Sequence, residues 1–543
     1  MKAGTTSDSD RTGRFSRRQF LRAAGALGGA ALVGRRALAQ SVPPVPSFVG
    51  SLEHAKLASQ HEVWEWQNFM VDLGIRLPGS PQHVRYLDFL EEGCARAGLR
   101  TFHDPTQRYP RWEADYTKCA LSILEDDGSA TDVEAMSYFP GSGNTSKLPG
   151  GALVGPLVDA GQGLPEDFAA GIATGSMKGA IAFCTEPRLP TTDALAYPNY
   201  YLNDPDMTVT PVTPYRKWSL SILSPQSVAT PALAEQAGCA GMIIALEATR
   251  KCALGQYVSF LLTEVRGDQA NGAPGMPILY VDYRTGQYIK SRLQALGSTT
   301  RARMVLPSKT HPNTGTDEIV AFLPGATGDA NDPSKGENVI IASHTDGTSA
   351  SEENGPLGML ALAKYFAKIP RSQRRRSLVF CFATGHFTDA YTKDTAWFTA
   401  HHPEIVANTV ATLTVEHLGQ KSYTDDPQAD TYTYDGFPEL ALSYVSQHPL
   451  LIESVIANYQ TENLTRAAVI NGPGFGVSQA FFNANLPSYA FITGPNTLYQ
   501  MDRETVLEGT DPARMHQEIR TFARILKGWE NLSKEELRAG AAV

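Results

Sequence analysis

The chain from about residue 317 onward alternates short, wholly apolar runs with segments of helical periodicity. The apolar runs, which are predicted to be strands, span residues 338–343, 377–383, 411–415 and 485–492. Residues 357–367 and 512–529 carry apolar positions at helical spacing. Strands that are apolar on both faces and alternate with helices are typical of a mainly parallel sheet flanked by helices. This part of the chain is therefore predicted to have an α/β fold.

Residues 150–305 have a different texture, in which short strand-like runs are bounded by glycine and proline. These runs span residues 151–158, 179–184, 240–245 and 276–281. A Pro/Tyr/Asp-rich stretch, 186–215, interrupts them and is predicted to be a surface excursion. The change of texture predicts a β-rich domain over 150–305, inserted into a core made of residues 40–149 and 306–543.

The first 39 residues have the three parts of an export signal. Arg17 and Arg18 precede a weakly apolar Ala/Gly-rich stretch, and Ala37-Leu38-Ala39 has the small-x-small pattern of a cleavage site. The apolar stretch is far shorter than the ~20 residues that span a bilayer, so it is interpreted as a signal and not as an anchor. The segment resembles twin-arginine signals, which implies a periplasmic or secreted protein that begins near Gln40.

Composition narrows the class of protein without indicating a reaction. Hydrophobic residues make up 42% of the chain and charged residues 19%, as in ordinary globular proteins. The net charge of −9 comes without a basic stripe, which argues against nucleic acid or an anionic membrane as a partner. The 6 cysteines include no C-x-x-C pair, so no cysteine-based zinc site is visible.

Polar residues follow the predicted strands where each strand ends. They are His344 and Asp346 after the first strand, Glu352 and Glu353 before the next helix, His386 after the second strand, and Glu416 and His417 after the third. The carboxyl ends of parallel strands meet at one edge of a sheet, where ligand sites form. Imidazoles and carboxylates are ligands of Zn²⁺ and similar divalent ions. Any one of these residues has a structural explanation, but together they indicate a polar site.

These motifs resemble the co-catalytic zinc aminopeptidases, the superfamily that includes glutamate carboxypeptidase and the transferrin receptor. Residues 76–80, Arg-Leu-Pro-Gly-Ser, resemble an N-terminal motif of that family, and residues 150–305 resemble its inserted protease-associated domain. The resemblance implies a zinc-exopeptidase-like fold. It also implies metal ligands at four positions, with Asp346 orienting the first of them: His344, Glu353, His386 and Glu416.

Two positions depart from the family pattern. Gly385 stands where the family has its general base, and Ser478 stands where it has its last histidine ligand. One divalent ion, most simply zinc, is therefore expected instead of two. Glu352 and His417 are the nearest replacements for the base. Because successive side chains on a strand face opposite ways, Glu416 and His417 can both face the site only if the strand has ended before them.

The sequence favours an exported metal-dependent hydrolase that acts on peptides or related amide or ester substrates. Two alternatives stay open. One is a peptidase-like binding protein that has lost the general base, as the transferrin receptor is within the superfamily. The other is a different reaction on the same site, such as that of an aminoacyl cyclase. The sequence does not identify the substrate, and it leaves homo-oligomer formation open.

Overall fold

In the computed structural model, the described residues are 48–125, 129–186, 191–192, 199–209, 214–215, 225–257, 275–388, 394–471, 474, 476–494 and 497–538. The predicted signal segment, residues 1–39, lies outside them. No helix among the described residues is both long and apolar enough to cross a membrane.

The larger of the two main sheets has nine strands. In spatial order they are β1 (Arg100–Pro105), β15 (Asp317–Leu323), β17 (Ser377–Ala383), β16 (Asn338–His344), β18 (Thr409–Val415), β23 (Ser488–Thr493), β21 (Ala441–Val445), β22 (Ala467–Asn471) and β9 (Asn199–Asn203). The four apolar runs of the sequence are β16, β17, β18 and β23, which lie side by side and run parallel. Antiparallel pairs flank them, so the predicted α/β class is confirmed and the sheet is mixed towards its edges.

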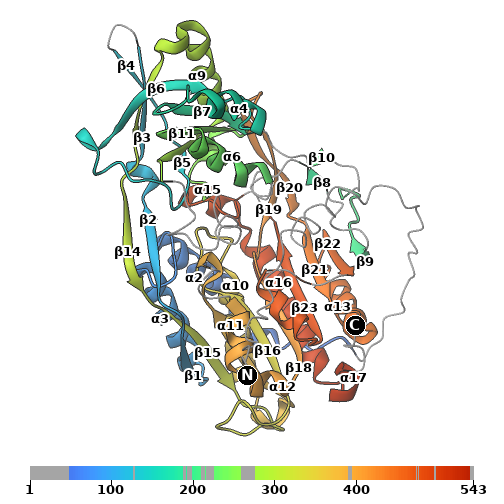
Figure 1. Cartoon of the computed structure of the whole chain (residues 1–543). Helices are drawn as coiled ribbons and strands as arrows, with labels where there is room; N and C mark the ends of the chain where they lie inside the picture. Colours follow the sequence, from blue (N-terminus) through green and yellow to red (C-terminus); the bar gives the residue numbers. More distant parts are fainter. Residues whose placement is uncertain are drawn as a thin grey trace, which may run out of the picture. The chain divides into compact units, whose positions relative to one another are not determined.

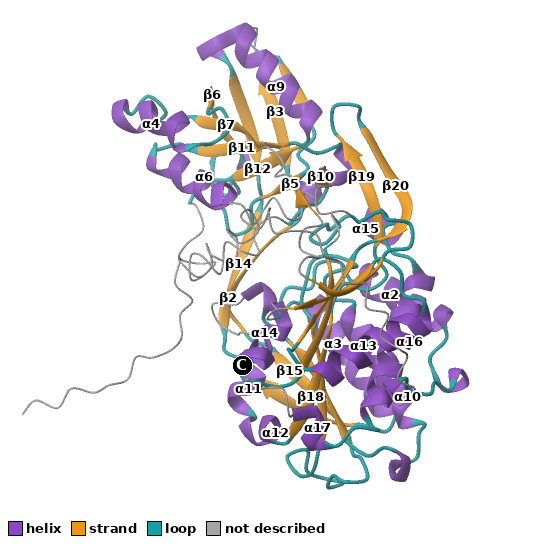
Figure 2. Cartoon of the chain, turned by 90° about the vertical axis from the view of Figure 1, so that its right-hand side faces the viewer, coloured by secondary structure: helices purple, strands orange, loops and turns teal. Residues whose placement is uncertain are grey.

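Helices cover both faces of this sheet (Figure 2). On one side lie α2 (Gln60–Asp72), α3 (Pro81–Arg96), α10 (Gly355–Ala367), α13 (Pro449–Glu462) and α16 (Pro512–Trp529). On the other side lie α11 (Asp394–His401), α12 (Pro403–Ala407) and α14 (Gln479–Asn483). The predicted helices at 357–367 and 512–529 correspond to α10 and α16.

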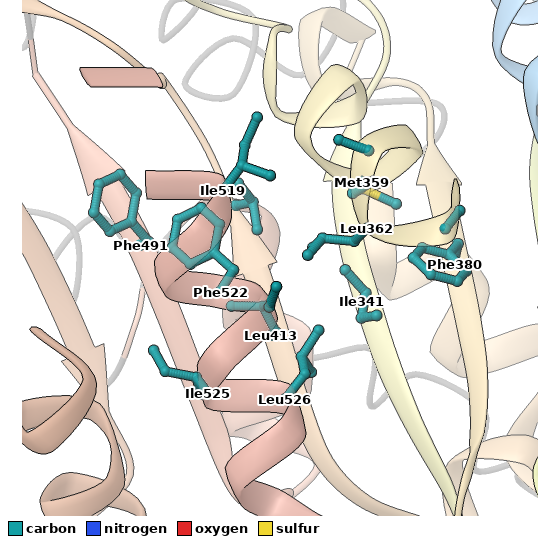
Figure 3. Close-up of a cluster of buried hydrophobic side chains, with 14 of the residues drawn as sticks. Ile341, Met359, Leu362, Phe380, Leu413, Phe491, Ile519, Phe522, Ile525 and Leu526 are labelled. Carbon is teal, nitrogen blue, oxygen red and sulfur yellow. The ribbon is translucent and has the colours of Figure 1, made fainter. Parts of the chain in front are cut away.

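The four central strands are buried at every position, and most of their residues are apolar, because both faces of the sheet are covered. Ile341 packs in one hydrophobic cluster with side chains of α10 and α16 (Figure 3), whereas its neighbour Ile340 belongs to a second cluster with Phe398 of α11. Full burial of such a side chain contributes roughly 1.5–3 kcal/mol each. β16 ends at His344, which pairs with Ala383 of the parallel strand β17.

The second main sheet has eight strands. In spatial order they are β4 (Ala130–Val133), β3 (Ala120–Leu124), β13 (Arg301–Val305), β6 (Leu153–Asp159), β7 (Ile181–Glu186), β11 (Gly241–Leu246), β12 (Ile278–Val281) and β5 (Ser137–Tyr138). Its helices are α4 (Pro165–Thr174), α6 (Pro225–Gln236) and α9 (Tyr283–Leu296). The strands β6, β7, β11 and β12 are those predicted from the glycine-bounded runs, and they run parallel.

A two-stranded ribbon carries the chain into the second sheet and back. It consists of β2 (Tyr109–Ala114) and β14 (Ser308–Thr314), which pair antiparallel and lie side by side in Figure 1. The strands β3, β4 and β5 belong to the second sheet although they precede residue 150. The predicted boundary at 150 therefore falls between strands of one sheet, since 120–138 was assigned to the core. The assignment of this unit as a protease-associated domain stays a prediction.

Shorter elements complete the described chain. β9, from the stretch 186–215, pairs with β22 at the edge of the nine-stranded sheet, so part of that predicted surface excursion belongs to the core. A hairpin is formed by β19 (Lys421–Asp426) and β20 (Thr431–Pro438). The remaining helices and strands are α7 (Arg250–Ala253), α15 (Arg503–Glu508), α17 (Lys534–Arg538), β8 (Thr191–Thr192) and β10 (Pro214–Tyr215).

Candidate metal centre

Two buried histidines at the strand ends are held in a defined tautomer. Nδ1 of His344 lies 2.7 Å from the carbonyl oxygen of Asp346, and Nδ1 of His417 lies 2.5 Å from the carbonyl oxygen of Thr493. A carbonyl oxygen only accepts hydrogen bonds, so in each imidazole Nδ1 carries the proton. Nε2 of each neutral ring therefore presents a lone pair, which is what a metal ligand requires.

A third histidine, His386, is anchored by a carboxylate. Its Nδ1 lies 2.8 Å from Oδ2 of Asp394, and its ring stacks on that of His344 with 4.1 Å between centroids. A carboxylate behind an imidazole is typical of metal-ligating histidines, because it fixes the ring and raises its basicity. Asp394 was not predicted from the sequence, since it begins α11 eight residues after His386 in no recognisable motif.

Glu352 lies at the centre of the three imidazoles. Its Oε1 is 3.8 Å from Nε2 of His344 and 3.6 Å from Nε2 of His386, and its Oε2 is 3.4 Å from Nε2 of His417. The side chain is only 1% exposed. The structure thus brings together Glu352 and His417, the two residues that the sequence offered as replacements for the missing base.

Glu416 completes the cluster and creates two alternative sets of ligands. His344, His386 and Glu416 have ligand atoms within 4.8 Å of one another, and so have His344, Glu352 and His417. Both sets use Nε2 of His344, because its Nδ1 is occupied by Asp346. One imidazole nitrogen binds one ion, so the two sets are alternatives for a single cation.

The chain turns sharply between Glu416 and His417, which lets both side chains face the site. β18 ends at Val415, and His417 has a φ of 58°, in the left-handed region that non-glycine residues rarely occupy. Such strain, about 1–3 kcal/mol, is found mostly at functional sites. The condition inferred from strand periodicity, that the strand must have ended, is met.

Asp346 acts differently from the predicted arrangement. Its carboxylate accepts hydrogen bonds from the backbone N–H groups of Gly385 (2.9 Å), His386 (3.3 Å) and Phe387 (2.8 Å). It orients His344 through its backbone carbonyl, while its side chain holds the loop that carries His386. Gly385 has a φ of 100°, so a glutamate at the family's base position would be strained here.

Glu353, predicted as a metal ligand, is instead the partner of Arg76. The two buried side chains form an ion pair, and Arg76 also donates to the carbonyl oxygens of Met70 and Ser349, each at 2.7 Å. A buried guanidinium needs a countercharge, which Glu353 supplies, and neither candidate ligand set among the described residues includes Glu353. The adjacent Glu352 takes the place at the site.

Ser478, at the position of the family's last histidine, lies in the turn Gly476–Ser478 that borders Glu416. The neighbouring Val477 donates a backbone hydrogen bond to the Glu416 carboxylate. A Cβ added to Gly476 would lie 3.4 Å from that carboxylate. This turn therefore packs against Glu416 and fixes its position without supplying an imidazole.

Burial sets the protonation of these groups. Burial raises the pKa of Glu352 well above its usual range and that of Glu416 to about 8. Burial also lowers the pKa of His417 to about 3 and that of His344 well below its usual value. Without a cation, the site therefore favours neutral imidazoles and protonated carboxyls.

His386 is the exception. Burial lowers its pKa, but the charge of Asp394, its hydrogen bond, and the carboxylates of Glu352 and Glu416 together raise it well above the usual value. In the metal-free protein the imidazole of His386 is therefore protonated and positively charged. A metal ion would take over that charge when His386 loses its Nε2 proton.

The residues fit a divalent cation. In the described part of the chain, Nε2 of His344, Nε2 of His417 and Oε2 of Glu352 are buried without a hydrogen bond. Such atoms are costly to bury unless something compensates for the lost contact with water. Imidazole nitrogens and carboxylate oxygens that face one another are a suitable donor set for Zn²⁺.

The comparisons with known proteins agree with this fold. No family model and no curated protein matches the chain. Among solved structures, the chain is similar to a peptidase M28 precursor from Shewanella amazonensis, with a TM-score of 0.61, 15% identity, and 88% of this chain and 95% of that chain covered. It is also similar to a zinc aminopeptidase from Bacillus subtilis, with a TM-score of 0.55, 14% identity, and coverage of 88% and 96%. The resemblance inferred from the sequence is thus confirmed for the fold: the chain is built like the zinc aminopeptidases and M28 peptidases.

Proposed function

We propose that the protein is a metal-dependent hydrolase of peptides or related amides, with one cation held by His344, His386 and Glu416. The observation that carries the proposal is the convergence of these three buried side chains, whose ligand atoms lie within 4.8 Å of one another. Two imidazoles and one carboxylate with an open position are the ligand set of many zinc hydrolases. The alternative set would use Glu352 as a ligand and leave Glu416, whose Oε2 lies 3.9 Å from Nε2 of His344, as the carboxylate beside the ion.

Glu352 is assigned as the general base. A divalent cation at the site supplies Lewis-acid chemistry by polarising the substrate carbonyl. With a cation bound, ionised Glu352 would take a proton from the attacking water and return it to the leaving amine. Nε2 of His417, 3.4 Å from Oε2 of Glu352, orients the carboxyl and accepts from it when it is protonated.

A binding protein without catalysis is the second candidate. Gly385 favours it, because the family's base is absent from this position and its φ of 100° disfavours any side chain there. The two candidates differ in one property: a hydrolase needs Glu352, and a binding protein does not.

The test is hydrolysis of aminoacyl 4-nitroanilides by the chain from Gln40 onward, measured before and after removal of metal by a chelator. We expect activity that zinc restores, and its loss in Glu352→Gln with the zinc content unchanged. Full activity in the metal-free protein or in Glu352→Gln would refute the proposed mechanism. A zinc-loaded native protein that is inert would favour the binding protein.

Export by the twin-arginine route is a separate part of the proposal and rests on Arg17 and Arg18. Replacing both with lysine should leave the precursor in the cytoplasm, as detected by fractionation and immunoblotting. Unchanged export would indicate that the segment works as a general secretory signal.

A further inference from the structure

Phe387 connects the loop of His386 to a different part of the molecule. Its backbone N–H donates to Oδ2 of Asp346 at 2.8 Å, in the same set of bonds that holds His386. Its ring is 1% exposed and belongs to the hydrophobic cluster formed mainly by side chains of the eight-stranded sheet. The residue next to a candidate ligand is thus part of the core of the second sheet.

Among the described residues, the rings of His386, Tyr257 and Tyr499 lie edge to face with Phe387. Its centroid lies 5.8 Å from that of His386, 5.8 Å from that of Tyr257 and 6.4 Å from that of Tyr499. Edge-to-face pairs at these distances contribute about 0.5–1.5 kcal/mol each beyond the area that they bury. Phe387 therefore has a defined orientation, set from one side by Tyr257.

Tyr257 is held by backbone hydrogen bonds between its own segment and residues 499–501. Its backbone N–H donates to the carbonyl oxygen of Tyr499 at 2.8 Å, and the N–H of Met501 donates to the carbonyl oxygen of Gly255 at 2.7 Å. The side chain of Gln500 donates to the carbonyl oxygens of Lys251 (2.6 Å) and Leu254 (2.9 Å). Residues 251–257 and 499–501 thus form a short paired segment that places the Tyr257 ring.

The series of rings continues into the second sheet. Tyr257 lies edge to face with Tyr138 of β5 at 6.3 Å, and Tyr138 does so with Trp112 of β2 at 5.3 Å. All three side chains are at most 7% exposed. In close-packed interiors a side chain cannot shift without its neighbours. A continuous row of rings therefore extends from the ribbon and the second sheet to the imidazole of His386.

We propose that Tyr257 and Phe387 are positioning residues, through which the eight-stranded sheet sets the orientation of His386 at the metal centre. The proposal rests on the proposed function only in that His386 is a ligand. The loop of His386 is held from one side by the carboxylate of Asp346 and from the other by the Phe387 ring. Loosening the ring side would let the imidazole rotate away from the position that its partners define.

The test compares Phe387→Leu and Tyr257→Leu with Phe168→Leu. Phe168 of α4 is equally buried in the same cluster, so its replacement removes a ring from the same core without touching the row. The zinc dissociation constant, measured by competition with a chromogenic chelator, should rise about tenfold in the first two variants, as for other residues behind a metal ligand. It should not change in Phe168→Leu.

A second readout uses the metal-free protein. With ¹⁵N-labelled histidine, the ring signals of His386, assigned from their loss in His386→Gln, should shift in Phe387→Leu and Tyr257→Leu but not in Phe168→Leu. Unshifted signals together with native zinc affinity would overturn the proposal, even if the melting temperature falls. If the native protein binds no zinc, the proposed function fails, and the nitrogen shifts still decide whether the rings position His386.

Discussion

The two large sheets share a design but use their strand ends in different ways. Each has a set of parallel strands whose carboxyl ends are followed by polar residues. In the eight-stranded sheet, Asp159 accepts from the N–H of Gly161 at 2.9 Å, and Asp282 caps α9 by accepting from the N–H of Thr285 at 3.0 Å. In the nine-stranded sheet, Nε2 of His344 and Oε2 of Glu352 are buried with no hydrogen bond in the described residues.

This difference separates structural from functional polar groups. An acid after a strand that binds the next backbone N–H has a complete local explanation as a turn or cap. The buried Nε2 atom of His344, which both candidate ligand sets share, has no such local explanation, and a bound cation would give it a partner. The ends of parallel strands predict where polar residues cluster. Whether such a cluster is a functional site is shown only by the hydrogen bonds that its side-chain atoms make or lack.

Removing His344 should have the largest effect. His344→Ala removes the nitrogen that both ligand sets share, so we expect loss of zinc and of all hydrolase activity. The corresponding change in the other sheet, Asp282→Ala, should cost about 1 kcal/mol of stability, as for other N-caps, and leave zinc in place. Metal analysis and chemical denaturation of both variants check this. Full zinc content in His344→Ala would contradict the view that the strand ends of the nine-stranded sheet form a metal site and those of the eight-stranded sheet only caps and turns.

Substitutions of the adjacent acids Glu352 and Glu353 should have different effects, one on the rate of catalysis and the other on stability. Glu352→Gln should lower kcat by roughly 10²–10⁴-fold, the usual contribution of a general base, while zinc stays bound. Glu353→Gln should lower the free energy of unfolding by about 3 kcal/mol, because it leaves the buried charge of Arg76 without its partner. Kinetics and urea denaturation measure the two effects. Loss of zinc from Glu353→Gln at full stability would restore Glu353 as a ligand.

Asp346→Asn should have an intermediate effect. The carboxylate of Asp346 now accepts hydrogen bonds from backbone N–H groups of the His386 loop. In the variant, the amide NH₂ group would face one of these donors and could not accept from it, so the loop would be held less firmly. The expected result is a ten- to a hundredfold weaker zinc affinity, the usual cost of losing a carboxylate behind a ligand. Chelator competition measures it, and native affinity would show that the loop is held by other contacts.

The smallest and most gradual effect should be on pH dependence. Burial raises the pKa of Glu416 to about 8, and, against the effect of burial, the neighbouring carboxylates raise the pKa of His386 well above its usual value, so zinc must displace a proton from each. Zinc affinity should therefore rise with pH, by up to about tenfold per pH unit for each displaced proton. For the metal-free protein the sign is opposite. The raised pKa of Glu416 contributes stability that is fully present below about 4.5 and is lost as the pH rises through about 8. Zinc titrations and thermal melts at several pH values test both trends, and pH-independent affinity would contradict the assignment of Glu416 and His386 as ligands.

The fold was predictable because burial on both faces leaves an unbroken apolar run, as in β16 and β17. The gathering of His344, His386 and Glu416 at one edge of the sheet was predictable because these residues follow such strands. The ion pair of Glu353 with Arg76 was not predictable, because Arg76 lies in a helix-flanking turn far away in sequence. Asp394 and the inclusion of β3 to β5 in the second sheet likewise depend on tertiary contacts that no local pattern records.

The most direct test of the account is the number of zinc ions that the chain from Gln40 onward binds, measured by calorimetric titration of chelator-treated protein. Because both ligand sets require the one free nitrogen of His344, we expect a single ion per chain and none in His344→Ala. Two ions per native chain, or none at all, would contradict it.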